Sequence, residues 1–297
     1  MLNELLQAIV SGLLVGLTYA LMSVGFSLTW GAVGVINISH AVFSVLAAYI
    51  GYFSVTNLGL NPLFSLIIII PLFYIIGIAM NGTVFKALTK RSRNLAFASM
   101  VLTFGLAVAI ENLMMWGFTA NPRVLTTSFS DFSFNIGPVY LLGSQIMSSI
   151  LSVICLFIIY LYLYHTSTGK SVRAYEQERE GAALSGVNTN KVTSITVGIA
   201  LASAGVAGVA LSLIFPFEPT IHMDWLVMIF LIVILGGVGN IIGTFIGGIV
   251  VGMISTVIGV WIPYTLVNLV MFVILIIILI IRIKEISFYG KLSKRKA

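Results

Sequence analysis

Charge is scarce in this sequence of 297 residues, of which only 8% are Asp, Glu, Lys or Arg. A soluble globular chain carries roughly a quarter of its residues as charged ones, so the composition excludes an ordinary soluble protein. Cysteine is almost absent too, and the single thiol, Cys155, lies in an apolar run, which excludes an intrachain disulfide. Apolar residues make up 59% of the chain. This composition indicates a protein of the lipid bilayer.

The residue patterns that carry enzyme chemistry are also missing. The three histidines, His40, His165 and His222, are scattered without the spacing of metal ligands. The sequence contains no G-x-x-x-x-G-K-[ST] segment, so it has no P-loop for ATP. We therefore expect no enzyme, no cofactor bound by this chain and no metal site. Energy for any transport would come from a partner or from a gradient.

Long apolar windows are what the sequence has instead. A hydrocarbon core about 30 Å thick needs roughly 20 apolar helical residues. Windows of this kind lie near 5–29, 31–53, 62–85, 95–117, 138–164, 192–214, 225–238, 241–260 and 262–281. The first window lacks the basic start of a signal peptide, so we expect it to be a retained span. The prediction is an all-α integral membrane protein with one transmembrane domain over residues 1–297.

Two places in this bundle are expected to interrupt a helix. The run Gly236-Gly237-Val238-Gly239-Asn240 frees the backbone from helical angles between two apolar windows. A second glycine-spaced run precedes Asn37, Ser39 and His40. We predict a polytopic helical bundle of about 8–10 transmembrane segments, with broken or re-entrant helices near 31–41 and 225–245.

Basic residues orient the predicted spans. Fourteen of the fifteen lie in three clusters, at 86–93, at 170–191 and at 282–296, and Arg123 is the exception. Short loops rich in Lys and Arg stay in the cytoplasm, so we expect a cytoplasmic loop at 165–191 and a basic cytoplasmic tail at 282–297. With nine crossings the N-terminus lies outside and the C-terminus inside. The bases are not interleaved with exposed aromatics, so we expect membrane lipid and no nucleic acid as the counter-charge.

The loop at 165–191 is the longest polar run in the chain. It contains the bases Lys170, Arg173, Arg179 and Lys191 and the acids Glu176, Glu178 and Glu180. Its residue types predict a helix from Arg173 to Leu184 that ends at Gly186, and Thr189 and Asn190 are the expected N-caps of the next span. Such a helix suits a groove on a soluble partner, and it equally suits a solvated connector.

Polar residues inside apolar windows are the default functional candidates in a membrane protein. The group Asn37, Ser39 and His40 indicates either a helix break that lines a cavity or a loop at the inner membrane surface. Glu111 lies near the outer end of the fourth span, where an acid reaches water or Arg123, and we favour this interpretation over a role in proton coupling. Asn240 is a weaker candidate.

Several motifs together resemble one known family, the inner-membrane permeases of branched-chain amino acid ABC transporters, the Liv type. The motifs are T-x-x-G-x-x-x-R-A at 166–174, A-A-L-x-G-V-N-T at 182–189, G-L-x-Y-A-L-x-S-x-G-F-S-L at 16–28, I-N-I-S-H at 36–40, T-F-G-L-A-V-A-I-E-N at 103–112, N-P-R at 121–123, A-S-A-G-V-A-G-V at 202–209 and L-G-G-V-G-N-I-I-G-T-F-I-G-G at 235–248. The resemblance covers nearly the whole chain, and the length fits the shorter permease subunit.

This resemblance implies an ABC importer for hydrophobic or branched-chain amino acids that works by alternating access in the cytoplasmic membrane of a bacterium or archaeon. It implies three kinds of partner: a second permease subunit in a heterodimer, two ATP-binding subunits that hold ATP and Mg, and an extracytoplasmic substrate-binding protein. Related members carry urea, short amides or other small solutes, which leaves the solute open. A gradient-driven secondary transporter is the other alternative.

The resemblance also assigns residues. A coupling helix that docks on the ATPase would contain Arg173, Ala174, Glu178, Glu180, Gly186 and Asn188. The substrate pathway would include Asn37, Ser39, His40, Asn240 and Glu111. The sequence departs from the family's usual I-N-F-A-H-G at Ile38, Ser39 and Ala41, which puts the width of the pathway in question. It also has Glu111 where the family commonly has Gln, which would place a charge near the outer gate.

Overall fold

The fold was taken from a computed structural model, which describes residues 1–59, 61–127 and 132–293, and the side chains of these except 264, 265 and 282–293. In chain order the elements are α1 (Leu2–Val33), α2 (Ser39–Leu58), α3 (Pro62–Met80), the π-helical turn η1 (Asn81–Phe85), α4 (Lys86–Arg91), α5 (Leu95–Phe118), β1 (Ser133–Ile136), β2 (Val139–Leu142), α6 (Gly143–His165), α7 (Ser167–Gln177), α8 (Arg179–Leu184), α9 (Thr189–Ser212), the 3₁₀ turn η2 (Pro219–Ile221), α10 (His222–Gly236), α11 (Ile241–Ile258) and α12 (Tyr264–Ser293).

Apolar helices dominate this chain, as its composition predicts. Within the described residues, 8 helices are long and apolar enough to cross a membrane, and the apolar part of α12, Leu266–Ile281, is shorter. This confirms the prediction of an all-α polytopic membrane protein. The helix α1 has 32 residues and is about 48 Å long at 1.5 Å per residue, so it exceeds the thickness of the hydrocarbon core.

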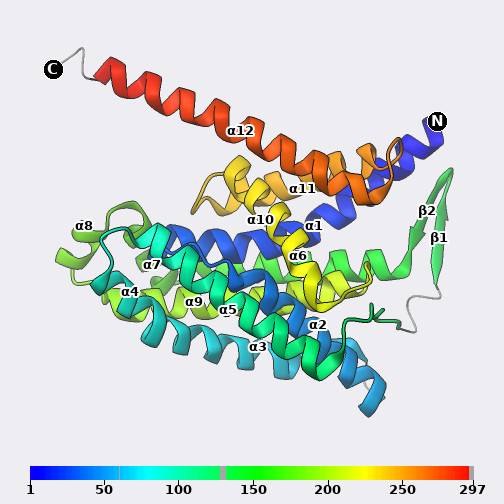
Figure 1. Cartoon of the computed structure of the whole chain (residues 1–297), viewed down its shortest axis with the longest axis horizontal. Helices are drawn as coiled ribbons and strands as arrows, with labels where there is room; N and C mark the ends of the chain where they lie inside the picture. The colour runs from blue at the N-terminus through cyan, green and yellow to red at the C-terminus, as the bar shows by residue number, and fades with distance from the viewer. Residues whose placement is uncertain (60, 128–131, 294–297) are drawn as a thin grey trace.

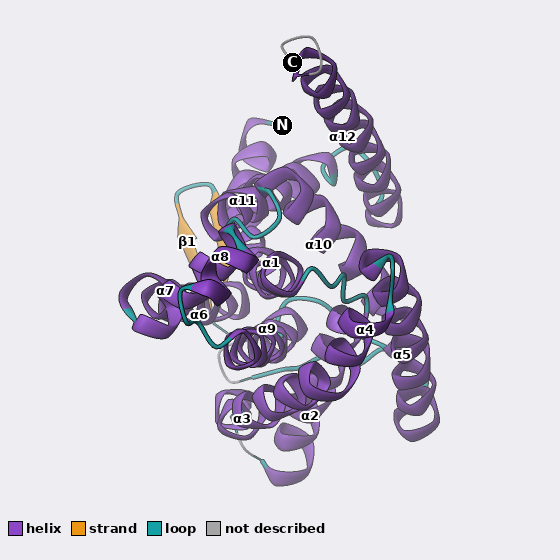
Figure 2. Ribbon diagram, turned by 90° about the vertical axis from the view of Figure 1, so that its left-hand side faces the viewer, coloured by secondary structure: helices purple, strands orange, loops and turns teal. Residues whose placement is uncertain are grey.

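The helices α1 and α9 form the centre of the bundle, and α5 and α12 lie at its edge (Figure 2). In the most apolar stretch of α9, 78% of the residues are buried, whereas the share for α5 is 22%. Glycine permits a close approach of α1 and α11: a Cβ placed on Gly16 would lie 2.8 Å from the carbonyl oxygen of Gly248. The hydrophobic effect does not drive helices together in lipid, so the close packing that small residues allow stabilises their contacts instead.

Both expected helix breaks are present. The helix α1 ends where Gly34 adopts φ 76°, and α2 begins five residues later at Ser39. The second break separates α10 from α11, and Gly237 and Gly239 have φ values of 91° and 77° there. These left-handed angles favour glycine because it lacks a Cβ. Both breaks therefore follow from the local sequence.

The structure differs from the sequence-based prediction in the segment before α6. The expected span at 138–164 begins only at Gly143, because 133–142 forms an antiparallel hairpin in which Ile136 pairs with Val139. Gly137, with φ 60°, precedes Pro138 in the turn, and proline disfavours a helical conformation in the residue before it. The hairpin was not predicted because its apolar residues merge with those of the following span.

The polar loop also differs from its prediction. The single helix expected from Arg173 to Leu184 is two helices, because Glu178 is extended, with φ −150° and ψ 104°, between α7 and α8. The N-cap of α9 is Asn188, whose Oδ1 accepts a hydrogen bond from the Lys191 N–H at 3.0 Å, and not Thr189 or Asn190. Gly186 follows α8 with φ 84°, as expected for a helix stop.

The two ends of the bundle carry different elements (Figure 1). The N-terminus and the β hairpin lie at one end, and α4, α7 and α8 lie at the other. The helix α12 runs from the hairpin end toward the end that carries α7 and α8, and it continues beyond the expected span to Ser293. Residues 294–297 of the predicted basic tail lie outside the described residues. The orientation of the two ends across the membrane stays a prediction.

Candidate functional site

The break between α1 and α2 is held by hydroxyl groups of α5. The backbone N–H of Ile36 donates to Ser99 Oγ at 3.1 Å, and the N–H of Ile38 donates to Thr103 Oγ1 at 3.0 Å. The Thr103 hydroxyl in turn donates to the carbonyl of Ile36 at 3.2 Å. Non-helical backbone within a membrane protein needs such partners because lipid supplies none. The break is thus built into the protein interior.

Asn37, Ser39 and His40 lie beside this break and are at most 1% exposed. The Ser39 hydroxyl donates to Asn37 Oδ1 at 2.6 Å, and His40 Nε2 donates to the carbonyl of Met22 at 3.1 Å. Among the described residues, Asn37 Nδ2 and His40 Nδ1 have no hydrogen-bond partner. Their burial argues against a loop at the membrane surface. Unpaired buried polar atoms call for water or for another conformation, and a place on the pathway stays a prediction.

Glu111 has a partner that the sequence did not reveal. Its Oε2 lies 2.9 Å from Nε2 of His222, which is fully buried at the start of α10. Arg123, the partner considered from the sequence, instead pairs its backbone with Phe217 and lies 5.6 Å from the centre of the Tyr52 ring. The pair of Glu111 and His222 therefore joins α5 to α10.

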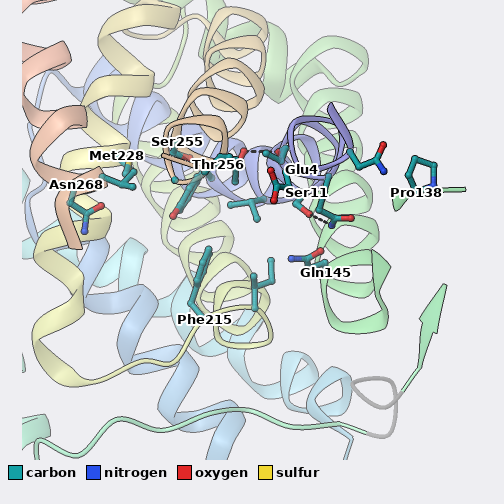
Figure 3. A pocket seen from close by; sticks show the side chains of 18 residues that line it. Glu4, Ser11, Pro138, Gln145, Phe215, Met228, Ser255, Thr256 and Asn268 are labelled. Carbon is teal, nitrogen blue, oxygen red and sulfur yellow. Dashed lines mark hydrogen bonds between the residues drawn. The ribbon is translucent and has the colours of Figure 1, made fainter. Parts of the chain in front are cut away.

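A cavity of about 610 Å³ opens at the hairpin end of the bundle (Figure 3). We call it the outer cavity. The polar side chains that line it are Asn3, Glu4, Gln7, Ser11, Gln145, Ser255, Thr256 and Asn268. The apolar side is formed by Ala8, Val15, Tyr19, Ile214, Phe215, Met228, Val260 and Val267. Gln7 Nε2 donates to Ser11 Oγ at 2.9 Å, and the Thr256 hydroxyl donates to the carbonyl of Ala8 at 2.8 Å.

The outer cavity combines amides and hydroxyls with an apolar wall. Glu4 is the only charged side chain among its lining residues. A volume of several hundred Å³ with a few polar groups suits a small organic molecule. This lining can hold a solute that has both a polar and an apolar part. Sequence reasoning missed this cavity because its walls come from α1, α6, α10, α11 and α12.

The predicted coupling residues occupy the opposite end of the molecule. Ala174 on α7, Glu178 between the two helices and Glu180 on α8 are exposed, and Gly186 and Asn188 follow α8 toward α9. The Arg173 side chain is held against the end of α6, because its Nε donates to the carbonyl of Leu163 at 3.2 Å. The sequence did not single out Leu184, which is 90% exposed at the end of α8. This exposure leaves the Leu184 side chain accessible to a partner.

Asn240, the remaining pathway candidate, begins α11 and caps it through Oδ1, which accepts from the Gly243 N–H at 3.0 Å. It lines a second cavity of about 510 Å³ between the end of α1 and α7. We call this the inner cavity, because it lies on the side of α7. Within the described part of the chain, no group of three or more His, Cys, Asp or Glu residues is placed to hold a metal.

Comparison with known proteins agrees with this architecture. The family described as "Branched-chain amino acid transport system / permease component" matches residues 8–280. The permease BraD of Pseudomonas aeruginosa, from a high-affinity branched-chain amino acid transport system, is 26% identical over 262 residues, which is 84% of each chain.

Two further relatives have different names. The corresponding permease LivH of Escherichia coli is 24% identical over 268 residues and 84% of each chain. The ribose import permease RbsC of Haemophilus influenzae is 26% identical over 265 residues, or 86% of this chain and 75% of RbsC. No solved structure matches. Since the family match spans most of the chain, this protein belongs to the family of permease components of branched-chain amino acid transport systems.

Proposed function

We propose that this chain is one membrane subunit of an ABC importer that moves branched-chain or other hydrophobic amino acids into the cell. Its partners would be a second permease subunit, two ATP-binding subunits that hold ATP and Mg, and an extracytoplasmic binding protein. The membrane would be the cytoplasmic membrane of a bacterium or archaeon, with α7, α8 and the C-terminus inside. The family membership and the names of the relatives support this proposal.

The observation that carries the coupling part of the proposal is the surface of α8. Leu184 is 90% exposed, whereas Ala182 on the same short helix is 6% exposed. Burying a leucine side chain contributes about 1.5–3 kcal/mol, so a partner groove that covers Leu184 would gain most from this residue. Glu178 and Glu180 precede it, are exposed as well, and would set the orientation of docking. We assign this surface to the ATP-binding subunit.

The pathway part of the proposal joins three places along the bundle. The outer cavity receives the solute, and its apolar wall contacts the aliphatic side chain. Asn37, Ser39 and His40 lie at the break in the interior, where a rearrangement would give their unpaired atoms partners in the solute or in water. The inner cavity with Asn240 lies at the exit. Alternating access would open these ends in turn.

A neutral polar solute is the second candidate. The amides and hydroxyls of the outer cavity also suit a sugar or a short amide, and the relative RbsC is a ribose import permease. Competition by leucine, ribose and urea against uptake of labelled leucine separates these solute classes. Uptake that ribose blocks and leucine does not would favour the second candidate.

Reconstitution tests the proposal. The chain is placed in proteoliposomes with its second permease, ATP-binding subunits and binding protein, and uptake of leucine is measured with and without enclosed ATP. We expect uptake that depends on ATP. Leu184→Asp should reduce it at least tenfold because a charge replaces the docked side chain, and Leu184→Met should keep it because the apolar volume remains. Uptake driven by a proton or sodium gradient without the ATP-binding subunits would contradict the proposal.

A further inference from the structure

The inner cavity lies where four parts of the chain meet, at the end of the bundle that faces the viewer in Figure 2. Trp30 and Gly31 come from the last turns of α1, Tyr164 from the end of α6, Arg173 and Glu176 from α7, and Gly239 and Asn240 from the break between α10 and α11. Its volume of about 510 Å³ falls in the range of small-molecule sites. Neither the transport chemistry nor the docking surface described above uses its acid.

Glu176 supplies a half-buried carboxyl group to this cavity. Its Oε1 is buried and has no hydrogen-bond partner among the described residues, and it lies 3.2 Å from the position of a Cβ on Gly31. Burial raises the pKa of this carboxyl to about 7, although nearby Arg173 lowers it. A buried carboxylate without a partner costs free energy. The Oε1 atom of Glu176 is therefore available to a hydrogen-bond donor or a cation of a ligand.

Arg173 supplies the opposite charge. Its guanidinium carbon lies 4.4 Å from the centre of the Tyr164 ring, and its Nε donates to the carbonyl of Leu163. These contacts fix the guanidinium, and no ion pair joins it to Glu176 within the part of the chain that the structure describes. Asn240 uses Oδ1 to cap α11, so its amide NH2 is the group that remains to donate. The cavity is thus lined by an acid and a guanidinium that are three residues apart on α7, with the amide of Asn240 as a further donor.

A free amino acid has the complementary arrangement of charges. Its ammonium group matches the carboxylate of Glu176, its carboxylate matches the guanidinium of Arg173, which favours planar carboxylates, and its side chain would meet Trp30, Val238 and Ile241. We propose that the inner cavity binds a free amino acid from the cytoplasmic end of the permease. This inference rests on the proposed function for the identity of that end and for the class of solute.

Occupancy of this site has a mechanical consequence. The ligand would join α7 to the end of α1 and to the start of α11, and α7 leads directly into α8 and its docking surface. An amino acid that has accumulated in the cell would stabilise this arrangement and slow further import. The transported amino acid would then act on the coupling loop through this site.

Binding is tested on the purified complex in lipid nanodiscs, without the binding protein. Labelled L-leucine is the probe, with isoamylamine, which lacks the carboxylate, and 4-methylpentanoate, which lacks the amine, as competitors. We expect Glu176→Gln to weaken leucine binding at least tenfold, because the amide is nearly isosteric but uncharged. Lys170→Gln, which removes a charge at an exposed position of the same helix, should leave binding as in the parent. Neither competitor should displace leucine at equal concentration.

The pH profile separates loss of charge from loss of structure. Only the ionised carboxyl pairs with an ammonium group, and Glu176 has a pKa of about 7 without a ligand. Leucine affinity should therefore rise about tenfold from pH 6 to pH 8 in the parent and stay constant in Glu176→Gln. The charged and titratable side chains among the residues that line the cavity with Glu176 are Arg173 and Tyr164, and the walls from α1 and 238–241 contribute none.

Three outcomes would overturn the inference: leucine binding that Glu176→Gln does not change, displacement by isoamylamine as effective as by leucine, or a flat pH profile in the parent. ATP-driven uptake with the binding protein, measured on the same preparation, keeps this result distinct from the proposed function. Uptake without binding at the inner cavity defeats this inference alone, whereas absence of uptake defeats the proposed function.

Discussion

His222 is fully buried, and its Nε2 lies 2.9 Å from Glu111 Oε2. Removing one member of a buried polar pair leaves the other without a partner, which costs about 1–3 kcal/mol. We expect His222→Ala to lower the midpoint of thermal unfolding in detergent more than Glu111→Gln does, because the glutamine amide can still bond to the ring.

Asn112→Ala is the matched control, since the amide of Asn112 is exposed and donates only within its own helix, to the carbonyl of Val108. This variant should unfold at the parent temperature. An unchanged midpoint for His222→Ala would mean that water or lipid headgroups replace the ring, and the pair would then have no structural role.

The pair of Glu111 and His222 shows which properties of single residues can be predicted from the sequence and which cannot. An acid in an apolar window is visible in the sequence, so Glu111 was singled out. Its partner is 111 residues away, and no local pattern connects the two. Leu184 is a similar case, because leucine in a helix suggests burial, and only the fold shows that this one points outward. Glu176 was recognised as one of several loop acids, but its burial depends on α1 and the break before α11.

At the scale of the element, α1 and α11 depend on glycine for their contact. A Cβ on Gly252 would clash with the Cα of Gly16, whereas a Cβ on Gly105 in α5 would meet no atom within 4 Å. We expect Gly252→Ala to destabilise the protein by about 1–3 kcal/mol, since overpacking forces the backbones apart. Gly105→Ala should be neutral or stabilising, because alanine favours a helix over glycine.

Thermal unfolding of both variants in the same detergent measures the difference. Equal midpoints would show that the contact between α1 and α11 is looser than the structure indicates, and the packing argument would fail. The opposite order, with Gly105→Ala the less stable variant, would place the sensitive contact on α5 instead.

Helix breaks were the most predictable elements, because the glycines that permit left-handed angles stand in the sequence at Gly34, Gly237 and Gly239. The hairpin at 133–142 and the division of the loop at Glu178 were not predictable in the same way. An apolar strand beside an apolar span has no separate signal, and residues 173–184 are good helix formers throughout. The interruption at Glu178 reflects tertiary packing of α7 on the bundle, with Val172 fully buried.

At the scale of the whole molecule, the distribution of bases predicts which end faces the cytoplasm. The arginine and lysine clusters at 86–93 and 170–191 lie at the same end of the bundle as α8, and the β hairpin lies at the other end. Membrane insertion favours the basic end inside. The coupling surface, the inner cavity and the outer cavity are all assigned to sides of the membrane by this one inference.

Cysteine labelling in intact cells tests this orientation of the bundle in a single experiment. In a variant whose native thiol is removed by Cys155→Ser, Leu184→Cys and Asn135→Cys place one thiol at each end, both at exposed positions. A membrane-impermeant maleimide should label Asn135→Cys in intact cells, and it should label Leu184→Cys only after the membrane is opened. The reverse pattern would put α8 outside, where no ATP-binding subunit could reach it. The two cavities would then exchange sides, and both the coupling proposal and the amino acid site at Glu176 would fail together.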